Sequence, residues 1–154
     1  MRKIIITLFL GVLISANSFS QKKLAWHTDL NQAVEIAIKE NKKMMLFFTG
    51  SDWCGWCVRL QKEVFKTPSF EKWSEDVVLV ELDFPRRTPQ DETIKAQNQY
   101  LQSIFQVRGY PSIHFVTPEK TADGKMNLNN LGKIGYVKGG PNKWLEAANS
   151  IVKK

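Results

Sequence analysis

The feature of the sequence that most limits its possible folds is the tetrapeptide Cys54-Gly55-Trp56-Cys57, which contains both cysteines of the chain. A disulfide between residues three positions apart closes a very short loop, so it removes little chain entropy from the unfolded state. Such a bond would be a poor structural crosslink. The pair is better explained by chemistry, either as a redox-active dithiol or as half of a metal site.

The residues around the tetrapeptide predict a strand followed by a helix. Residues 44–49 form a continuous apolar run, which is typical of a strand buried on both faces of an α/β sheet. A turn cluster follows at 50–52. From Cys54 onward, apolar residues recur at helical spacing until Thr67-Pro68 interrupts the pattern. We therefore expect both cysteines at the start of a helix that directly follows a buried strand.

The rest of the chain alternates between helical and strand patterns. The expected helices are 29–41, 91–107 and 144–152, and the expected strands are 77–84, 112–117 and 131–137. This order indicates parallel pairing early in the chain and a hairpin late. The expected fold class is α/β, with a central mixed β-sheet flanked by helices on both faces.

The first twenty residues have the pattern of a secretory signal peptide. A short basic region precedes an apolar run at 4–14, and small residues follow. The run is too short to span a bilayer comfortably as a helix. Cleavage after Ser20 or Ser18 fits the pattern, and an uncleaved anchor is the alternative. We expect a signal peptide at 1–20, one domain at 21–154, and a periplasmic or secreted mature protein without stable membrane insertion.

The formal charge of +7 does not indicate a nucleic-acid partner, because the basic residues are scattered rather than gathered into one run with aromatic residues. An exported protein with a single CxxC works where disulfides form and need management. The expected partners are exported cysteine-containing proteins and a thiol-disulfide exchange partner that recycles the cysteines. Thiol exchange of this kind requires no cofactor.

The spacing of the cysteines suits disulfide exchange. The thiolate is the attacking species, and an ordinary cysteine with a pKa of ~8.5 is mostly protonated at neutral pH. At the first turn of a helix, unpaired N–H groups and the helix dipole would lower the pKa of Cys54. Cys57, one turn later on the same face, can then resolve a mixed disulfide formed by Cys54.

A zinc site is the weaker explanation of the same motif. Structural zinc takes four ligands, and apart from the two cysteines the usual candidates are only His27 and His114, which are far apart in the sequence. Two cysteines that merely pack as small buried residues are a further alternative, but the neighbouring turn and Trp53 favour exposure.

Two segments resemble the thioredoxin superfamily. Residues 47–57, with the sequence FFTGSDWCGWC, resemble its active-site segment, and residues 107–112 resemble its second signature. The similarity covers nearly the whole chain after residue 20 and is nearest to exported, disulfide isomerase-like thiol-disulfide oxidoreductases. It implies a thioredoxin fold with catalytic Cys54 and Cys57 and a cis Pro111 against them. The resemblance and the exposed-looking aromatic side chains place a substrate groove at Trp53, Trp56, Tyr110 and Pro111.

The chain departs from thioredoxin at positions that bear on the mechanism. Phe48 stands where thioredoxin has a buried aspartate that assists proton transfer, so Glu81 is a possible replacement, or else a solvent-facing strand charge. Trp56 supplies no cation to the Cys54 thiolate, which favours a reducing or isomerising role. Segment 83–99, which carries Arg86 and Arg87, is either a partner contact or simply a longer loop. A non-catalytic adaptor that binds extended peptides is the alternative function.

Overall fold

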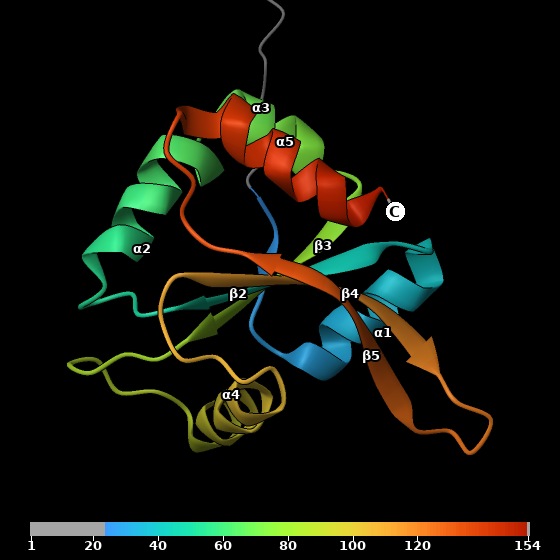
Figure 1. Ribbon diagram of the computed structural model, residues 1–154. Helices are drawn as coiled ribbons and strands as arrows, with labels where there is room; N and C mark the ends of the chain where they lie inside the picture. The colour runs from blue at the N-terminus through green and yellow to red at the C-terminus, as the bar shows by residue number, and fades with distance from the viewer. Residues whose placement is uncertain (1–23, 154) are drawn as a thin grey trace, which may run out of the picture.

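The computed structural model describes residues 24–153, so the expected signal peptide at 1–20 lies outside the described residues. Five strands form one sheet in the order β1-β3-β2-β4-β5 (Figure 1). The strands are β1 (Trp26–His27), β2 (Lys43–Thr49), β3 (Val77–Asp83), β4 (Ser112–Lys120) and β5 (Met126–Ile134). β1 and β2 pair with β3 in parallel, whereas β4 runs antiparallel to both β2 and β5. The predicted mixed sheet with a late hairpin is confirmed.

Helices cover both faces of this sheet. They are α1 (Leu30–Glu40), α2 (Gly55–Leu60), α3 (Pro68–Ser74), α4 (Glu92–Ile104) and α5 (Gly140–Val152), and a π-helical segment at Gln61–Phe65 continues α2. Figure 1 shows α2, α3 and α5 on one face and α1 and α4 on the other. The arrangement is a thioredoxin fold, as expected.

The sequence of β2 is apolar without alternation because this central strand lies between two hydrophobic cores. Met45 and Phe47 belong to the core under α2, α3 and α5, which also contains both cysteines. Met44, Leu46 and Phe48 belong to the core under α1 and α4. Both faces of the strand from Met44 to Phe48 are therefore buried, which favours apolar residues on both. One consequence is that the cysteines share a packed core with the strand that precedes them.

The sequence pattern missed α3. We expected Thr67-Pro68 only to end the helix that starts after Cys54, but the same two residues also begin a new helix. The Thr67 hydroxyl caps α3 by accepting a hydrogen bond from the Phe70 amide, and Pro68 lies in the first turn. A proline is tolerated there because its missing N–H would have no partner within the helix.

The edge strand β5 spans Met126–Ile134, whereas we expected 131–137. It therefore both begins and ends earlier than predicted. Its first residues pair with the end of β4, where Lys120 faces Met126. An exposed edge strand can be polar on both faces, so hydrophobic alternation does not reveal it. A register shift next to Phe115 leaves Leu131 outside the ladder, which blurs the pattern further.

The loops that follow β2 and β3 and the loop that precedes β4 gather at one end of the sheet (Figure 1). The cysteines lie at this end, because α2 starts directly after the loop that follows β2. Within residues 24–153, no helix is long and apolar enough to cross a membrane.

Candidate active site at the Cys54–Cys57 disulfide

The two cysteines lie at the start of α2 and are joined by a disulfide. Cys54 is the N-cap residue, and its sulfur accepts a hydrogen bond from the Cys57 amide at 3.2 Å. Cys54 is 6% exposed, whereas Cys57 is fully buried. Cys54 is therefore the sulfur that an incoming group reaches first, and it lies where helix amides stabilise negative charge.

The loop before Cys54 is shaped by the close packing of Gly50 and Trp53. A Cβ atom on Gly50 would lie 2.4 Å from the Trp53 ring, so only glycine fits without displacing the indole. The indole N–H donates to the carbonyl oxygen of Phe84 at 2.7 Å. Trp53 therefore attaches the loop before the cysteines to the loop after β3.

Asp52 makes a second attachment between the same two loops. Its carboxylate accepts hydrogen bonds from the amides of Arg86, Arg87 and Thr88 at 3.0, 2.7 and 2.9 Å. These bonds, that of Arg86 foremost, hold the pKa of Asp52 at about 2. The carboxylate is thus ionised at neutral pH, and its hydrogen-bonding capacity is used to hold residues 86–88 in place.

The peptide bond between Tyr110 and Pro111 is cis, as the resemblance to thioredoxin implies. The Tyr110 ring meets the Trp53 ring edge to face, with centroids 5.5 Å apart. On the other side, a Cβ on Gly135 would lie 3.3 Å from the Pro111 carbonyl oxygen. The segment before β4 therefore lies between the cysteine loop and the segment after β5.

Trp56 is the exposed aromatic residue of the site, with 55% of its surface accessible. Its ring lies 5.2 Å from that of Tyr136, and the guanidinium of Arg59 lies 5.3 Å from the centroid of each ring. Glu63 accepts hydrogen bonds from Arg59, at 2.8 Å, and from the Tyr136 hydroxyl. The Tyr136 bond and then Arg59 lower the pKa of Glu63.

The sequence reasoning did not identify this group around Trp56. Arg59 and Glu63 are four residues apart on one helical stretch, which is a recognisable ion-pair spacing. Tyr136 joins them from the segment after β5, and no local pattern signals that contact.

Glu81 lies on β3, next to Phe47 in the parallel register. Leu79, two residues earlier, belongs to the cysteine-containing core, so Glu81 is on the same sheet face as the cysteines. Burial, and to a lesser extent the charge of Asp83, raises the pKa of Glu81. Among the described residues, the Glu81 carboxylate makes no hydrogen bond.

The two histidines weighed as metal ligands lie on different strands, with β3 and β2 between them. His27 is on β1 and His114 is on β4, where it is 1% exposed. Within the part of the chain that the structure describes, no three His, Cys, Asp or Glu side chains are placed to hold a metal ion.

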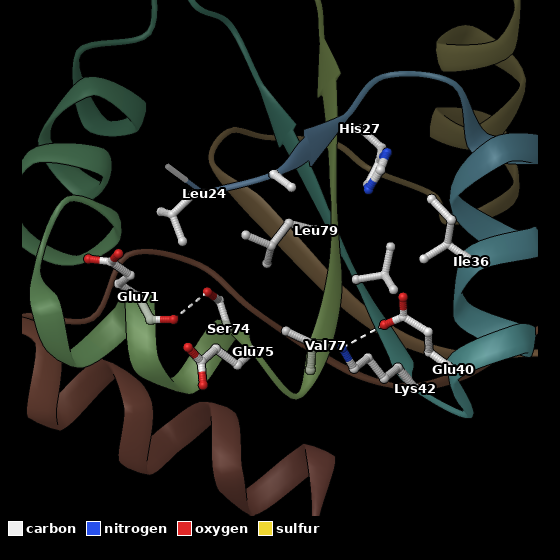
Figure 2. Close-up of a pocket in the computed structure, with 12 residues that line it drawn as sticks. Leu24, His27, Ile36, Glu40, Lys42, Glu71, Ser74, Glu75, Val77 and Leu79 are labelled. Atoms are coloured by element: carbon white, nitrogen blue, oxygen red, sulfur yellow. Dashed lines mark hydrogen bonds and ion pairs between the residues drawn. The ribbon is translucent and has the colours of Figure 1, made fainter. Parts of the chain in front are cut away.

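A separate hollow lies at the opposite end of the sheet. Figure 2 shows it between Leu24, Leu79 and the Lys42 side chain, whose ammonium group lies 2.7 Å from the carboxylate of Glu40. This hollow adjoins Val77, at the amino end of β3, whereas Cys54 follows the carboxyl end of the parallel strand β2. The hollow is therefore not part of the cysteine site.

Comparison with known proteins gives consistent results. A family model described as thioredoxin-like matches residues 25–118. The disulfide bond reductase DsbH of Chlamydia pneumoniae is 32% identical over 123 residues, which cover 79% of this chain and 69% of that protein. The thioredoxin-related protein DsbJ of the same organism is 30% identical over 137 residues, and the match covers 88% of this chain but only 38% of DsbJ.

Solved structures agree with this assignment. A structure described as DsbH oxidoreductase superposes with a TM-score of 0.76 at 29% identity and covers 93% of this chain and 94% of its own. A thioredoxin from Thermus thermophilus superposes with a TM-score of 0.59 at 19% identity, covering 83% of this chain and 86% of its own, and shows the fold alone.

Proposed function

This chain belongs to the thioredoxin-like family, and we propose that it is a thiol-disulfide oxidoreductase that reduces disulfides of exported proteins through Cys54 and Cys57. The observation that carries the proposal is the unequal placement of the two sulfurs. Cys54 caps α2 and keeps 6% of its surface exposed, whereas Cys57, which is joined to it by the disulfide, is fully buried. One sulfur is placed to attack a substrate, and the other is placed to resolve the product.

The reaction starts from the reduced dithiol. The Cys54 thiolate attacks one sulfur of the substrate disulfide, a Cys54–substrate disulfide forms, and the other substrate sulfur leaves as a thiolate. The Cys57 thiol then loses its proton and attacks the Cys54 sulfur. The Cys54–Cys57 disulfide forms, and the second substrate thiolate leaves. The substrate has gained two electrons and, after protonation, two thiols.

Residues around the disulfide would assist these steps. The Cys57 amide, which already donates to the Cys54 sulfur, would stabilise the Cys54 thiolate together with the helix dipole. Glu81, whose pKa is raised by burial, would accept the Cys57 proton as the second attack begins. The residues proposed to line a groove for an extended substrate are Trp53, Trp56, Tyr110 and Pro111.

Reduction is the direction that we propose in preference to isomerisation. The relative DsbH is described as a disulfide bond reductase, and the residues between the cysteines offer no cation that would stabilise the reduced form strongly. The electrons must come from a partner dithiol, which reduces the Cys54–Cys57 disulfide by the same exchange in reverse. No cofactor is required.

The proposed place of action is the periplasm or the exterior of the cell. The support is the sequence pattern of residues 1–20, read as a signal peptide in front of a single domain at 21–154. In that setting the substrates would be exported proteins that contain cysteines.

An insulin-reduction assay with dithiothreitol as the electron donor tests the function. Wild-type protein should accelerate the precipitation of the insulin B chain, and Cys54→Ser should abolish the acceleration. Cys57→Ser should accumulate a Cys54–substrate disulfide that mass spectrometry detects. An inactive wild type, together with no trapped species, would contradict the proposal; retained peptide binding in the double serine variant would then favour an adaptor.

A further inference from the structure

We propose that Arg86 is a specificity-determining residue, which favours substrates that carry an acidic side chain close to the disulfide to be reduced. This inference rests on the proposed reductase function and adds a preferred class of substrate to it. The observations that carry it are the position of the guanidinium beside the cysteine loop and its unpaired charge.

The guanidinium of Arg86 lies 3.7 Å from the centroid of the Trp53 ring, which is cation–π distance. Trp53 directly precedes Cys54, and its ring also meets Tyr110, the residue before Pro111. Arg86 reaches Tyr110 electrostatically as well: burial raises the pKa of Tyr110, and the charge of Arg86 opposes that rise. The positive charge is therefore next to Trp53, the residue before Cys54, and its field reaches Tyr110, the residue before the cis Pro111.

The side chain of Arg86 has no ion-pair partner among the described residues, although the ionised Asp52 carboxylate is bonded to its backbone amide. Arg86 is exposed, and among residues 24–153 no carboxylate forms an ion pair with it. The nearby carboxylate of Asp52 accepts backbone hydrogen bonds from residues 86–88 instead. By contrast, Arg59, which lies over Trp56, is paired with Glu63 at 2.8 Å.

The arrangement also holds the cation in position before any substrate arrives. The amide of Arg86 is bonded to Asp52, and its side chain rests on an indole that is itself bonded to Phe84. A side chain that is already ordered loses less conformational entropy when it forms an ion pair. A cation held against Trp53, the residue before Cys54, is complementary to an acidic residue of an extended substrate.

The test uses disulfide-bonded model peptides that differ only in one residue next to a cysteine, which is Glu, Gln or Lys. The rate constant for their reduction by the reduced protein is measured by stopped flow at low and at high salt. An exposed ion pair corresponds to a factor of about 1.4 to 5 in rate. Wild type should therefore reduce the Glu peptide about 1.4- to fivefold faster than the Gln peptide, and the Lys peptide more slowly than the Gln peptide.

Three variants separate the possible causes. Arg86→Gln should remove the preference, and Arg86→Glu should reverse it in favour of the Lys peptide. Arg87→Gln is the matched control, because Arg87 is the adjacent exposed arginine and has no ring contact among the described residues; it should retain the wild-type preference. High salt should weaken the preference of wild type, since the charges are exposed. Circular dichroism spectra and melting curves establish that each variant is folded.

Two results would overturn the inference while leaving the reductase function intact. One is a preference in Arg86→Gln equal to that of wild type. The other is that Arg86→Gln reduces all three peptides equally more slowly and has a higher Cys54 pKa than wild type in a thiolate absorbance titration. Arg86 would then act by stabilising the Cys54 thiolate and not by binding the substrate. If wild type reduced none of the peptides, the proposed function itself would fail.

Discussion

The Trp53 ring meets the Tyr110 ring edge to face, with centroids 5.5 Å apart. The residue before the first cysteine is thus packed against the residue before the cis proline, although the two come from loops far apart in the sequence. In this way the contact connects the cysteine loop to the start of β4. We expect the relative placement of Cys54 and Pro111 to depend on that connection.

A double-mutant cycle tests this coupling. Trp53→Leu, Tyr110→Leu and the double variant should show a coupling free energy of about 0.5–1.5 kcal/mol in urea unfolding, the range for aromatic pairs. Trp56→Leu combined with Tyr110→Leu is the matched control, and its effects should add. A coupling near zero for the first pair would mean that the two loops are placed independently.

Replacing Glu81 with Gln should change stability and activity in opposite directions. Because its pKa is raised in the folded protein, the folded state binds a proton more tightly than the unfolded state. Stability is therefore lost as the pH rises through the unfolded and then the folded pKa. Glu81→Gln removes this loss, so its free energy of unfolding at pH 7 should exceed that of wild type.

The activity readout for the same variant is the rate of resolution of a preformed Cys54–peptide disulfide. Glu81→Gln should resolve it several-fold more slowly near pH 7, and its rate should fall with decreasing pH from the pKa of the Cys57 thiol downward, because without the Glu81 carboxylate that thiol must lose its proton to solvent. Glu75→Gln, on an exposed residue near the end of α3, serves as a control for the loss of a carboxylate. A resolution rate and pH profile equal to those of wild type would restrict Glu81 to a structural role.

His114 should make the protein sensitive to mild acid. It packs against Phe48 and Phe105, and neither ring nitrogen has a well-formed hydrogen bond among the described residues. Burial, with the charge of Lys133 adding to it, lowers its pKa from 6.5 to about 4. The unfolded state therefore binds more protons between these values, and stability falls as the pH falls from about 6.5 to about 4.

The size of this effect can be measured with His114→Phe. The pKa shift corresponds to a loss on the order of 3 kcal/mol by pH 4 in wild type. The decrease in the free energy of unfolding between pH 7 and pH 4 should be smaller in His114→Phe than in wild type by that amount. His27→Gln, which alters the other histidine, should keep the wild-type loss. Equal losses in wild type and His114→Phe would contradict the argument.

The parts of the fold that follow a local pattern were predictable. The apolar run of β2 and the turn and helix after it placed Cys54 and Cys57 at a helix start without any knowledge of the tertiary structure. α3 was missed because Thr67-Pro68 can both end one helix and cap the next. The polar residues of β5 were missed because backbone pairing with β4, and not burial, holds an edge strand in place.

The candidate site was predictable only where the family motif covers it. The contacts of Arg86 with Trp53 and of Tyr136 with Glu63 join segments that are brought together by the fold, so no local spacing announces them. The same holds for Asp52, which follows a strand as an ordinary turn residue but anchors the amides of residues 86–88. Such contacts require the strand order and loop positions to be known first.

The most direct test of the central claim is the reduction potential of the Cys54–Cys57 pair. The pair is equilibrated in dithiothreitol buffers of defined potential, and the fraction of reduced protein is determined by alkylation and mass spectrometry. The proposed reductase function predicts a value near ~−270 mV, close to that of thioredoxin. A value near ~−180 mV, or a pair that does not interconvert between the dithiol and the disulfide, would contradict it.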